Sequence, residues 1–191
     1  MKKIYIVLTK TNTVLSRIIS VIKNDDYTHS SISLNKDLDN MYSFGRKNRY
    51  NPFVGCFVTE NLDKGVFGWH KNLKGMVLEI EVTNEQYERA EKLINEFILN
   101  SNKYKYSYIG LIDSLFNKEK HYNDRFLCSE FVYYILSKIE AADLQKSRNL
   151  IRPQDFLKIE SKILFEGNLK KSIWSKNTNH TFNIIPKYQS I

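Results

Sequence analysis

The chain has 191 residues, enough for one domain with a proper core and too few for two comfortable ones. Apolar residues make up 42% and charged residues 26%, as in soluble globular proteins, and only seven Gly and three Pro argue against long linkers. The formal net charge is +8, but the basic residues are scattered and form no basic arm, so charge alone gives little support to nucleic-acid binding. We expect one domain over residues 1–191, with 176–191 as an extended tail.

The first half of the chain combines short strand patterns with two helical ones. Apolar residues recur at helical spacing over 12–22 and again over 84–99, where Thr83 or Asn84 can cap the helix. Residues 46–72 predict loops around one short strand. β-Branched or alternating runs predict strands at 4–8, 27–34, 41–44, 56–59 and 76–82.

The second half predicts further helices. A short helix is expected over 108–116, and Asp124 can cap a longer one that continues through residue 139. A helical turn should follow Pro153, and residues 163–174 suggest a β-hairpin. The order of these elements predicts an α+β fold, with an antiparallel sheet or small barrel packed against helices.

Two features bear on the cellular compartment. The only cysteines, Cys56 and Cys128, do not make a disulfide framework and are simplest as free thiols in a reducing compartment. The apolar run 4–8 is shorter than the 7–15 residues or so of a secretory core or the roughly 20 of a membrane span. We therefore expect a soluble, cytoplasmic protein.

Cys128 and His29 are the residues that point to chemistry. Cys128 falls in the opening turns of the predicted helix, where free backbone amides and the positive end of the helix dipole lower a thiol pKa and can bind an oxyanion. His29 lies on the polar face of the strand 27–34, beside Ser31 and Ser33. A catalytic thiol needs a base that is distant in sequence and close in space. A buried structural cysteine and a surface histidine are the alternative interpretations.

Four ordered segments carry a resemblance. They are Tyr-Thr-His-Ser-Ser-Ile at 27–32, Tyr-Lys-Tyr-Ser-Tyr-Ile-Gly-Leu at 104–111, Phe-Leu-Cys-Ser-Glu-Phe-Val at 126–132 and Arg-Pro-Gln-Asp-Phe at 152–156. Together they resemble the circularly permuted branch of the NlpC-type papain-like superfamily, and within it the YiiX-like group. The likeness spans residues 4–160 in architecture, although its specific motifs cover only some thirty positions.

The resemblance implies a Cys–His pair, a catalytic Cys at a helix N-terminus and a third polar residue on the strand after His29. The matching position is Ser43, which can accept a hydrogen bond from an imidazole but cannot stabilise its cation as a carboxylate would. Alternatives for this third residue are Asp39, Asn40 and Glu79.

Three more residues are candidates for the substrate cleft. Glu130 follows Cys128 by two positions and points about 200° away around the helix, which favours support of a loop or of the cleft over action on the thiol. Tyr27 and Tyr106 are expected to line the cleft, with core packing as the alternative.

No other cluster indicates chemistry. His70, His121 and His180 have no Cys or carboxylate at ligand spacing, so we expect no zinc site, and no metal or organic cofactor is implied. Cys56 is expected in the core.

The sequence therefore predicts a cysteine hydrolase or acyltransferase acting on an amide, ester or thioester, with a small peptide, acyl-amide or lipid-like substrate. Two alternatives are a weakly active or inactive binding module on the same fold and, on charge alone, a basic nucleic-acid-binding protein. Oligomeric state cannot be predicted.

Overall fold

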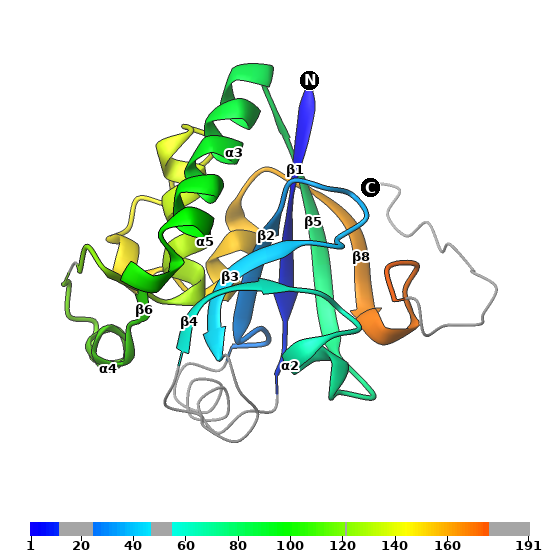
Figure 1. Cartoon of the computed structure of the whole chain (residues 1–191), viewed down its shortest axis with the longest axis horizontal. Coiled ribbons are helices and arrows are strands. Elements are labelled where there is room, and N and C mark those ends of the chain that lie inside the picture. The colour runs from blue at the N-terminus through cyan, green and yellow to red at the C-terminus, as the bar shows by residue number, and fades with distance from the viewer. Residues whose placement is uncertain (12–24, 47–54, 121, 176–191) are drawn as a thin grey trace, which may run out of the picture.

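The computed structural model describes residues 1–11, 25–46, 55–120 and 122–175. Within them, eight strands form one mixed sheet in the order β7-β6-β4-β3-β2-β1-β5-β8, with helices packed against it (Figure 1). The predicted α+β class is confirmed. The permuted papain-like arrangement stays a prediction.

The five strands predicted in the first half of the chain are present. Of these, β1 pairs antiparallel with both β2 and β5, and its apolar residues are buried on both faces of the sheet. All other described pairings are antiparallel except that of β6 with β7. The strands are β1 (Lys2–Thr9), β2 (His29–Ser33), β3 (Met41–Arg46), β4 (Gly55–Glu60), β5 (Lys74–Val82), β6 (Lys105–Tyr106), β7 (Arg125–Phe126) and β8 (Lys162–Asn168).

The predicted hairpin over 163–174 is wrong. β8 pairs with β5 instead, and the chain then turns through a 3₁₀ helix at Leu169–Lys171. Leu169 is fully buried under the sheet, so the apolar residues after β8 fill the core and do not form a returning strand.

The helices α3 (Asn84–Leu99) and α5 (Cys128–Lys138) lie together on one side of the sheet (Figure 1). Their apolar faces bury a cluster of aromatic residues in which Phe97 and Phe131 lie 4.9 Å apart, between ring centroids. The side chain of Thr83 caps α3 by accepting a hydrogen bond from the backbone of Gln86, as its position predicts. This packing fixes α5, and with it Cys128, against β2 and β3.

The remaining helices are short. α2 (Gly65–Gly68) was not predicted, whereas α4 (Tyr108–Leu115) matches the expected short helix at 108–116. The expected turn after Pro153 is a 3₁₀ helix over Pro153–Lys158, and two others span Ser101–Lys103 and Arg148–Leu150.

A second hydrophobic cluster lies on the opposite face of the sheet. It joins alternate residues of β1 and β5, such as Val7 and Val77, to Phe67 of α2 and to Leu169. Its aromatic border includes Phe165 and Trp174, whose rings meet at an angle of 85°. The two clusters bury both faces of β1, the strand that pairs with β2 as far as His29.

Some predictions concern residues outside the described ranges. The helix expected over 12–22 and the tail over 176–191 belong to this group. In the described part of the chain, no helix has the length and apolar character needed to span a membrane.

Candidate active site

Cys128 is the first residue of α5 and is buried. The residue before it, Leu127, is extended, so the helix begins abruptly at the thiol. The predicted cap, Asp124, is wrong: Leu127 occupies the N-cap position, and its backbone N–H donates to the Glu130 side chain at 3.2 Å. Cys128 therefore lies beside the free backbone N–H groups at the start of α5, the environment expected for a reactive thiol.

His29 opens β2, and its imidazole lies beside a carboxylate. Nε2 is 3.1 Å from Oε1 and 3.0 Å from Oε2 of Glu60, the last residue of β4. Ser31 Oγ donates to Glu60 Oε2 at 2.5 Å and holds that carboxylate in place. Cys128 also acts on the imidazole, since each of the two groups shifts the pKa of the other.

The surroundings of the His29 ring shape this contact. The edge of the imidazole meets Phe67, with ring centroids 5.8 Å apart. A Cβ atom on Gly45 would lie 3.4 Å from Glu60 Oε1 and 3.7 Å from His29 Cε1, so a side chain larger than methyl would crowd the pair. A methyl group at position 45 would therefore make ordinary contacts with the carboxylate of β4 and the imidazole of β2.

The two pKa values move in opposite directions. Burial raises the pKa of the Cys128 thiol, but the hydrogen bond and charge of His29, together with the backbone N–H groups of Ser30 and Ser129, outweigh burial and bring it below its ordinary value. Burial lowers the pKa of His29, but the Glu60 charge and Cys128 raise it well above its usual range. Both shifts favour a thiolate–imidazolium pair at neutral pH.

Ser43 does not take the orienting role that was predicted for it. Its buried hydroxyl donates to the backbone carbonyl of Ser30 at 2.7 Å, so it ties β3 to β2. Among the alternatives, Glu79 pairs with Lys3 at 2.6 Å, and Asp39 and Asn40 line the pocket that also contains Glu60. Sequence reasoning missed Glu60, because the predicted strand 56–59 ended one residue too early.

Glu130 is a structural residue in this geometry. It is buried, accepts the hydrogen bond from Leu127 and pairs with Arg148 at 2.9 Å. The sequence-based expectation that it supports a loop fits these contacts, whereas a place in the substrate cleft does not, because its oxygens face the start of α5.

Tyr27 and Tyr106, both expected to line the cleft, lie in different surroundings. Tyr27 is buried, and its hydroxyl donates to Glu166 at 3.3 Å, which fits the packing alternative. Tyr106 lines the same cleft as Cys128, as expected for a residue near substrate. Burial and the charge of Cys128 raise the Tyr106 pKa well above its usual range, so its hydroxyl stays protonated beside the thiolate.

The cleft beside Cys128 is narrow and mostly apolar. Its volume is about 30 Å³, and Tyr106 and Arg152 contribute its largest polar groups. The apolar lining comes from α4, from the start of α5 and from the segment around Pro153: Leu111, Leu115, Leu127, Ile151 and Pro153. Because this space is about the size of one water molecule, it admits only a small apolar group next to a scissile carbonyl.

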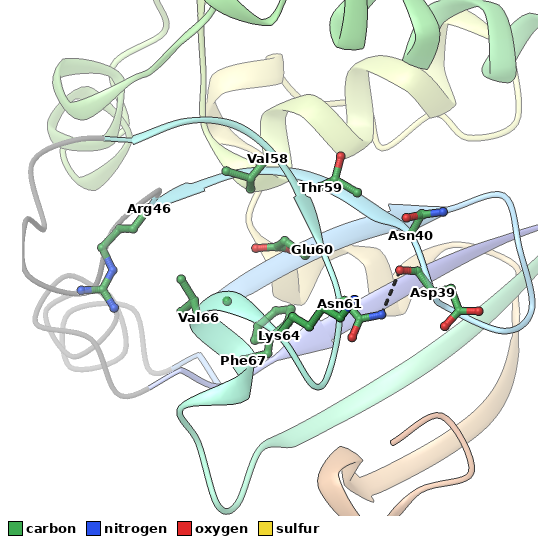
Figure 2. Close-up of a pocket in the computed structure, with 11 residues that line it drawn as sticks. Asp39, Asn40, Arg46, Val58, Thr59, Glu60, Asn61, Lys64, Val66 and Phe67 are labelled. Atoms are coloured by element: carbon green, nitrogen blue, oxygen red, sulfur yellow. Dashed lines mark hydrogen bonds between the residues drawn. The ribbon is translucent and has the colours of Figure 1, made fainter. Parts of the chain in front are cut away.

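A larger polar pocket of about 400 Å³ lies on the Glu60 side. Figure 2 shows Glu60 near its centre, Arg46 from the end of β3 on one side and Asp39 on the other. Lys64 adds a second cation, so the pocket carries charges of both signs. This pocket can hold a polar or charged part of a ligand close to Glu60.

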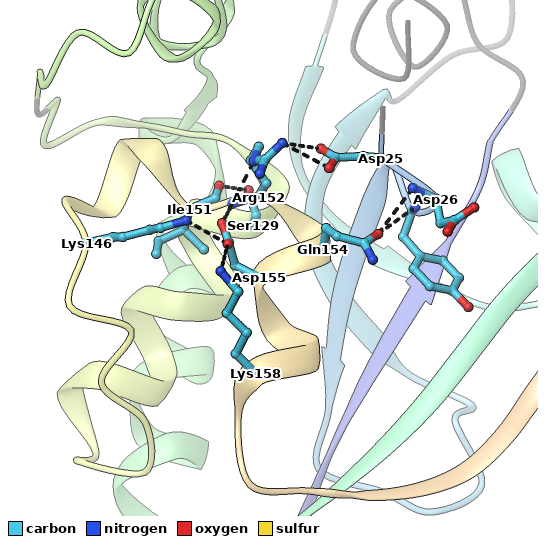
Figure 3. Close-up of polar contacts among 10 residues, drawn as sticks. Asp25, Asp26, Ser129, Lys146, Ile151, Arg152, Gln154, Asp155 and Lys158 are labelled. Carbon is cyan, nitrogen blue, oxygen red and sulfur yellow. Dashed lines mark hydrogen bonds and ion pairs between the residues drawn. The ribbon is translucent and has the colours of Figure 1, made fainter. Parts of the chain in front are cut away.

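Charged contacts hold the wall of the Cys128 cleft in place (Figure 3). Arg152 donates to both carboxylate oxygens of Asp25, at 2.9 and 3.1 Å, and thereby connects the cleft wall to the segment before β2. The buried Asp155 accepts from Lys146 at 2.7 Å and from Lys158 at 3.3 Å. Ser129 Oγ donates to the Ile151 carbonyl at 2.5 Å and joins α5 to the same wall.

Comparison of the chain with protein-family models, with curated proteins and with solved structures finds no match. The resemblance to the permuted papain-like proteins therefore stays a prediction.

The other candidates lie apart from this chemistry. Cys56 is only half-buried on β4, so it is not the core residue that was expected. Burial, with the charges of Lys170 and Arg46, lowers the pKa of His70. His121 and His180 lie outside the described residues. Among those described, no three His, Cys, Asp or Glu side chains form a group that could hold a metal ion.

Proposed function

We propose that this chain is a cysteine hydrolase or acyltransferase that forms an acyl-enzyme on Cys128. The observation that carries the proposal is the imidazole of His29, which lies 3.0 Å from the Glu60 carboxylate and lowers the pKa of the Cys128 thiol. A nucleophile, a base and a group that orients the base are the three parts that covalent acyl transfer requires. The order of the His strand before the Cys helix also agrees with the permuted papain-like resemblance.

In the proposed mechanism, His29 holds the proton that leaves Cys128, and the thiolate attacks the carbonyl carbon of an amide, ester or thioester. The N–H of Cys128, at the open end of α5, donates to the oxyanion of the tetrahedral intermediate. His29 then gives its proton to the leaving amine, alcohol or thiol as the carbon–heteroatom bond breaks. A thioester on Cys128 is left.

His29 next accepts a proton from water or from another acceptor, which attacks the thioester carbonyl. The acyl group leaves as an acid or as a new ester or amide, and the thiolate is restored. Glu60 keeps the imidazole oriented and stabilises its cation in both halves of the cycle. The apolar cleft favours substrates with an apolar acyl group, including small peptides and acyl-amides.

The competing interpretation, a non-catalytic binding module, was favoured by Ser43 as a weak orienting group. Because the imidazole contacts Glu60 instead, that reason no longer applies.

The proposal is tested by trapping the intermediate. The protein is mixed with a panel of small amides, esters and thioesters, and its intact mass is recorded at short times. We expect an added acyl mass on Cys128 that is absent in Cys128→Ser and forms much more slowly in His29→Ala. Acylation that is absent with every substrate class, or that occurs equally in Cys128→Ser, would contradict the proposal.

A further inference from the structure

α4 presents apolar side chains to solvent. Two exposed residues lie on the helix, Ile109 at 50% and Ile112 at 56%. The residue directly after the helix, Phe116, is 71% exposed. Their spacing of three and four residues puts them on one face of the helix. α4 lies at the outer edge of the molecule, away from β5 and β8 (Figure 1).

The opposite face of α4 is apolar as well. Leu111 is buried, and both Leu111 and Leu115 line the cleft that contains Cys128. Asp113 is the one charged residue between 108 and 116. A surface helix of a globular protein usually turns polar residues outward, so the exposed face of α4 is better suited to an apolar environment than to water.

The sequence on either side of α4 carries a net positive charge. Between residues 103 and 125 the sequence has five basic and three acidic side chains, and the whole chain carries +8. The basic ones are Lys103, Lys105, Lys118, Lys120 and Arg125, and the acidic ones are Asp113, Glu119 and Asp124. All four lysines are exposed. An apolar helix face bordered by lysines is the combination that binds anionic lipid surfaces.

We propose that the exposed face of α4 docks on an anionic lipid bilayer, with Ile112 and Phe116 inserted at the boundary between headgroups and acyl chains. The flanking lysines contact the anionic headgroups. Since Leu111 and Leu115 of the same helix line the Cys128 cleft, docking brings that cleft close to the lipid surface. The docking itself does not require Cys128 to be reactive.

The experiment is co-sedimentation of the full chain with vesicles of phosphatidylcholine, alone or mixed with phosphatidylglycerol. We expect binding to the anionic vesicles that weakens as salt is raised, and much less binding to phosphatidylcholine alone. Cys128→Ala should bind equally well, so a failure of the proposed catalysis leaves this test intact. The absence of binding to both kinds of vesicle would overturn the proposal.

The variant Ile112→Asn with Phe116→Ser tests the face itself. Both side chains are exposed, so the fold should survive, which near-ultraviolet circular dichroism checks. Ile163→Asn is the matched control, because Ile163 is 54% exposed on β8 at the opposite edge of the sheet. We expect at least about tenfold weaker vesicle binding for the double variant and no change for the control. An equal loss of vesicle binding in the double variant and in Ile163→Asn would overturn the assignment. So would a dimer of the native chain that the double variant abolishes while its vesicle binding persists.

Discussion

Glu60 supplies the negative charge that His29 needs in order to hold a proton while buried. A buried imidazolium without a counter-ion would be neutralised by desolvation. The bond from Ser31 to Glu60 keeps that carboxylate in its position, because Ser31 lies two residues along β2 from His29 and shares its polar face. The proposed pair of Cys128 on α5 and His29 on β2 therefore depends on a third element, β4.

Replacing Glu60 by Gln should weaken the thiolate. The amide keeps the shape of the side chain but removes the charge that stabilises the His29 cation, so we expect the alkylation rate of Cys128 at neutral pH to fall by about tenfold. Iodoacetamide labelling followed by mass spectrometry measures this rate.

Ser43→Ala is the matched control for Glu60→Gln. It should leave the labelling rate near that of the native protein and cost about 1–2 kcal/mol of unfolding free energy, because it removes only the hydrogen bond to the Ser30 carbonyl. A larger loss of reactivity in Ser43→Ala than in Glu60→Gln would restore Ser43 as the orienting residue.

Of the three residues in the proposed site, the sequence predicts His29 and Cys128 but not Glu60. His29 and Cys128 stand out because each has an unusual local setting, a polar strand face and the start of a helix. Glu60 has no such local signal. It meets His29 only in the folded sheet, where β3 lies between β4 and β2.

At the scale of elements, the start of α5 is fixed by Glu130, a buried residue of its own first turn. Glu130 satisfies the backbone of Leu127 and pairs with Arg148, whose guanidinium carbon lies 4.8 Å from the centre of the Phe126 ring. The sequence predicts the helix well from its apolar spacing. It misplaces the cap at Asp124, because the acceptor comes from inside the helix and the intervening residues form β7.

Glu130→Ala should destabilise the protein without removing a substrate contact. Loss of the buried ion pair and of the Leu127 hydrogen bond should cost about 3–5 kcal/mol of unfolding free energy, as measured by urea denaturation. In the fraction that remains folded, the apparent pKa of Cys128 should shift little. A native-like stability combined with impaired labelling would instead place Glu130 in the cleft.

The wall near Pro153 should be sensitive to acid. Burial raises the pKa of Asp155, but Lys146, the Arg152 backbone and Lys158 bring it below its ordinary value. Because the folded-state pKa is lowered, this contribution to stability is present above the ordinary aspartate pKa of about 4 and is lost as pH falls through the lowered value.

Urea denaturation at pH 7 and at acidic pH measures this dependence. Asp155→Asn should cost about 2–4 kcal/mol at pH 7 and should show a smaller loss of stability on acidification than the native protein. An identical acid dependence in both proteins would show that Asp155 does not contribute to it.

At the scale of the molecule, the site is assembled from strands and a helix that are far apart in the chain. β2 and β4, which flank β3 in the sheet, bring in the base and its carboxylate, and the aromatic cluster under α3 and α5 fixes the thiol. Five strands and the two main helices could be predicted from periodicity. The pairing of β8 with β5 could not, because the alternation of residues 163–174 does not distinguish a hairpin from one long-range strand.

The central claim is that His29 lowers the pKa of Cys128, and the pH dependence of iodoacetamide labelling tests it most directly. It is measured in a Cys56→Ser background with and without His29→Ala. We predict an apparent pKa well below the free-thiol value of about 8.5 in the parent, and one above that value in His29→Ala, where burial acts unopposed by the imidazole. An ordinary pKa in the parent that is unchanged by His29→Ala would contradict the account.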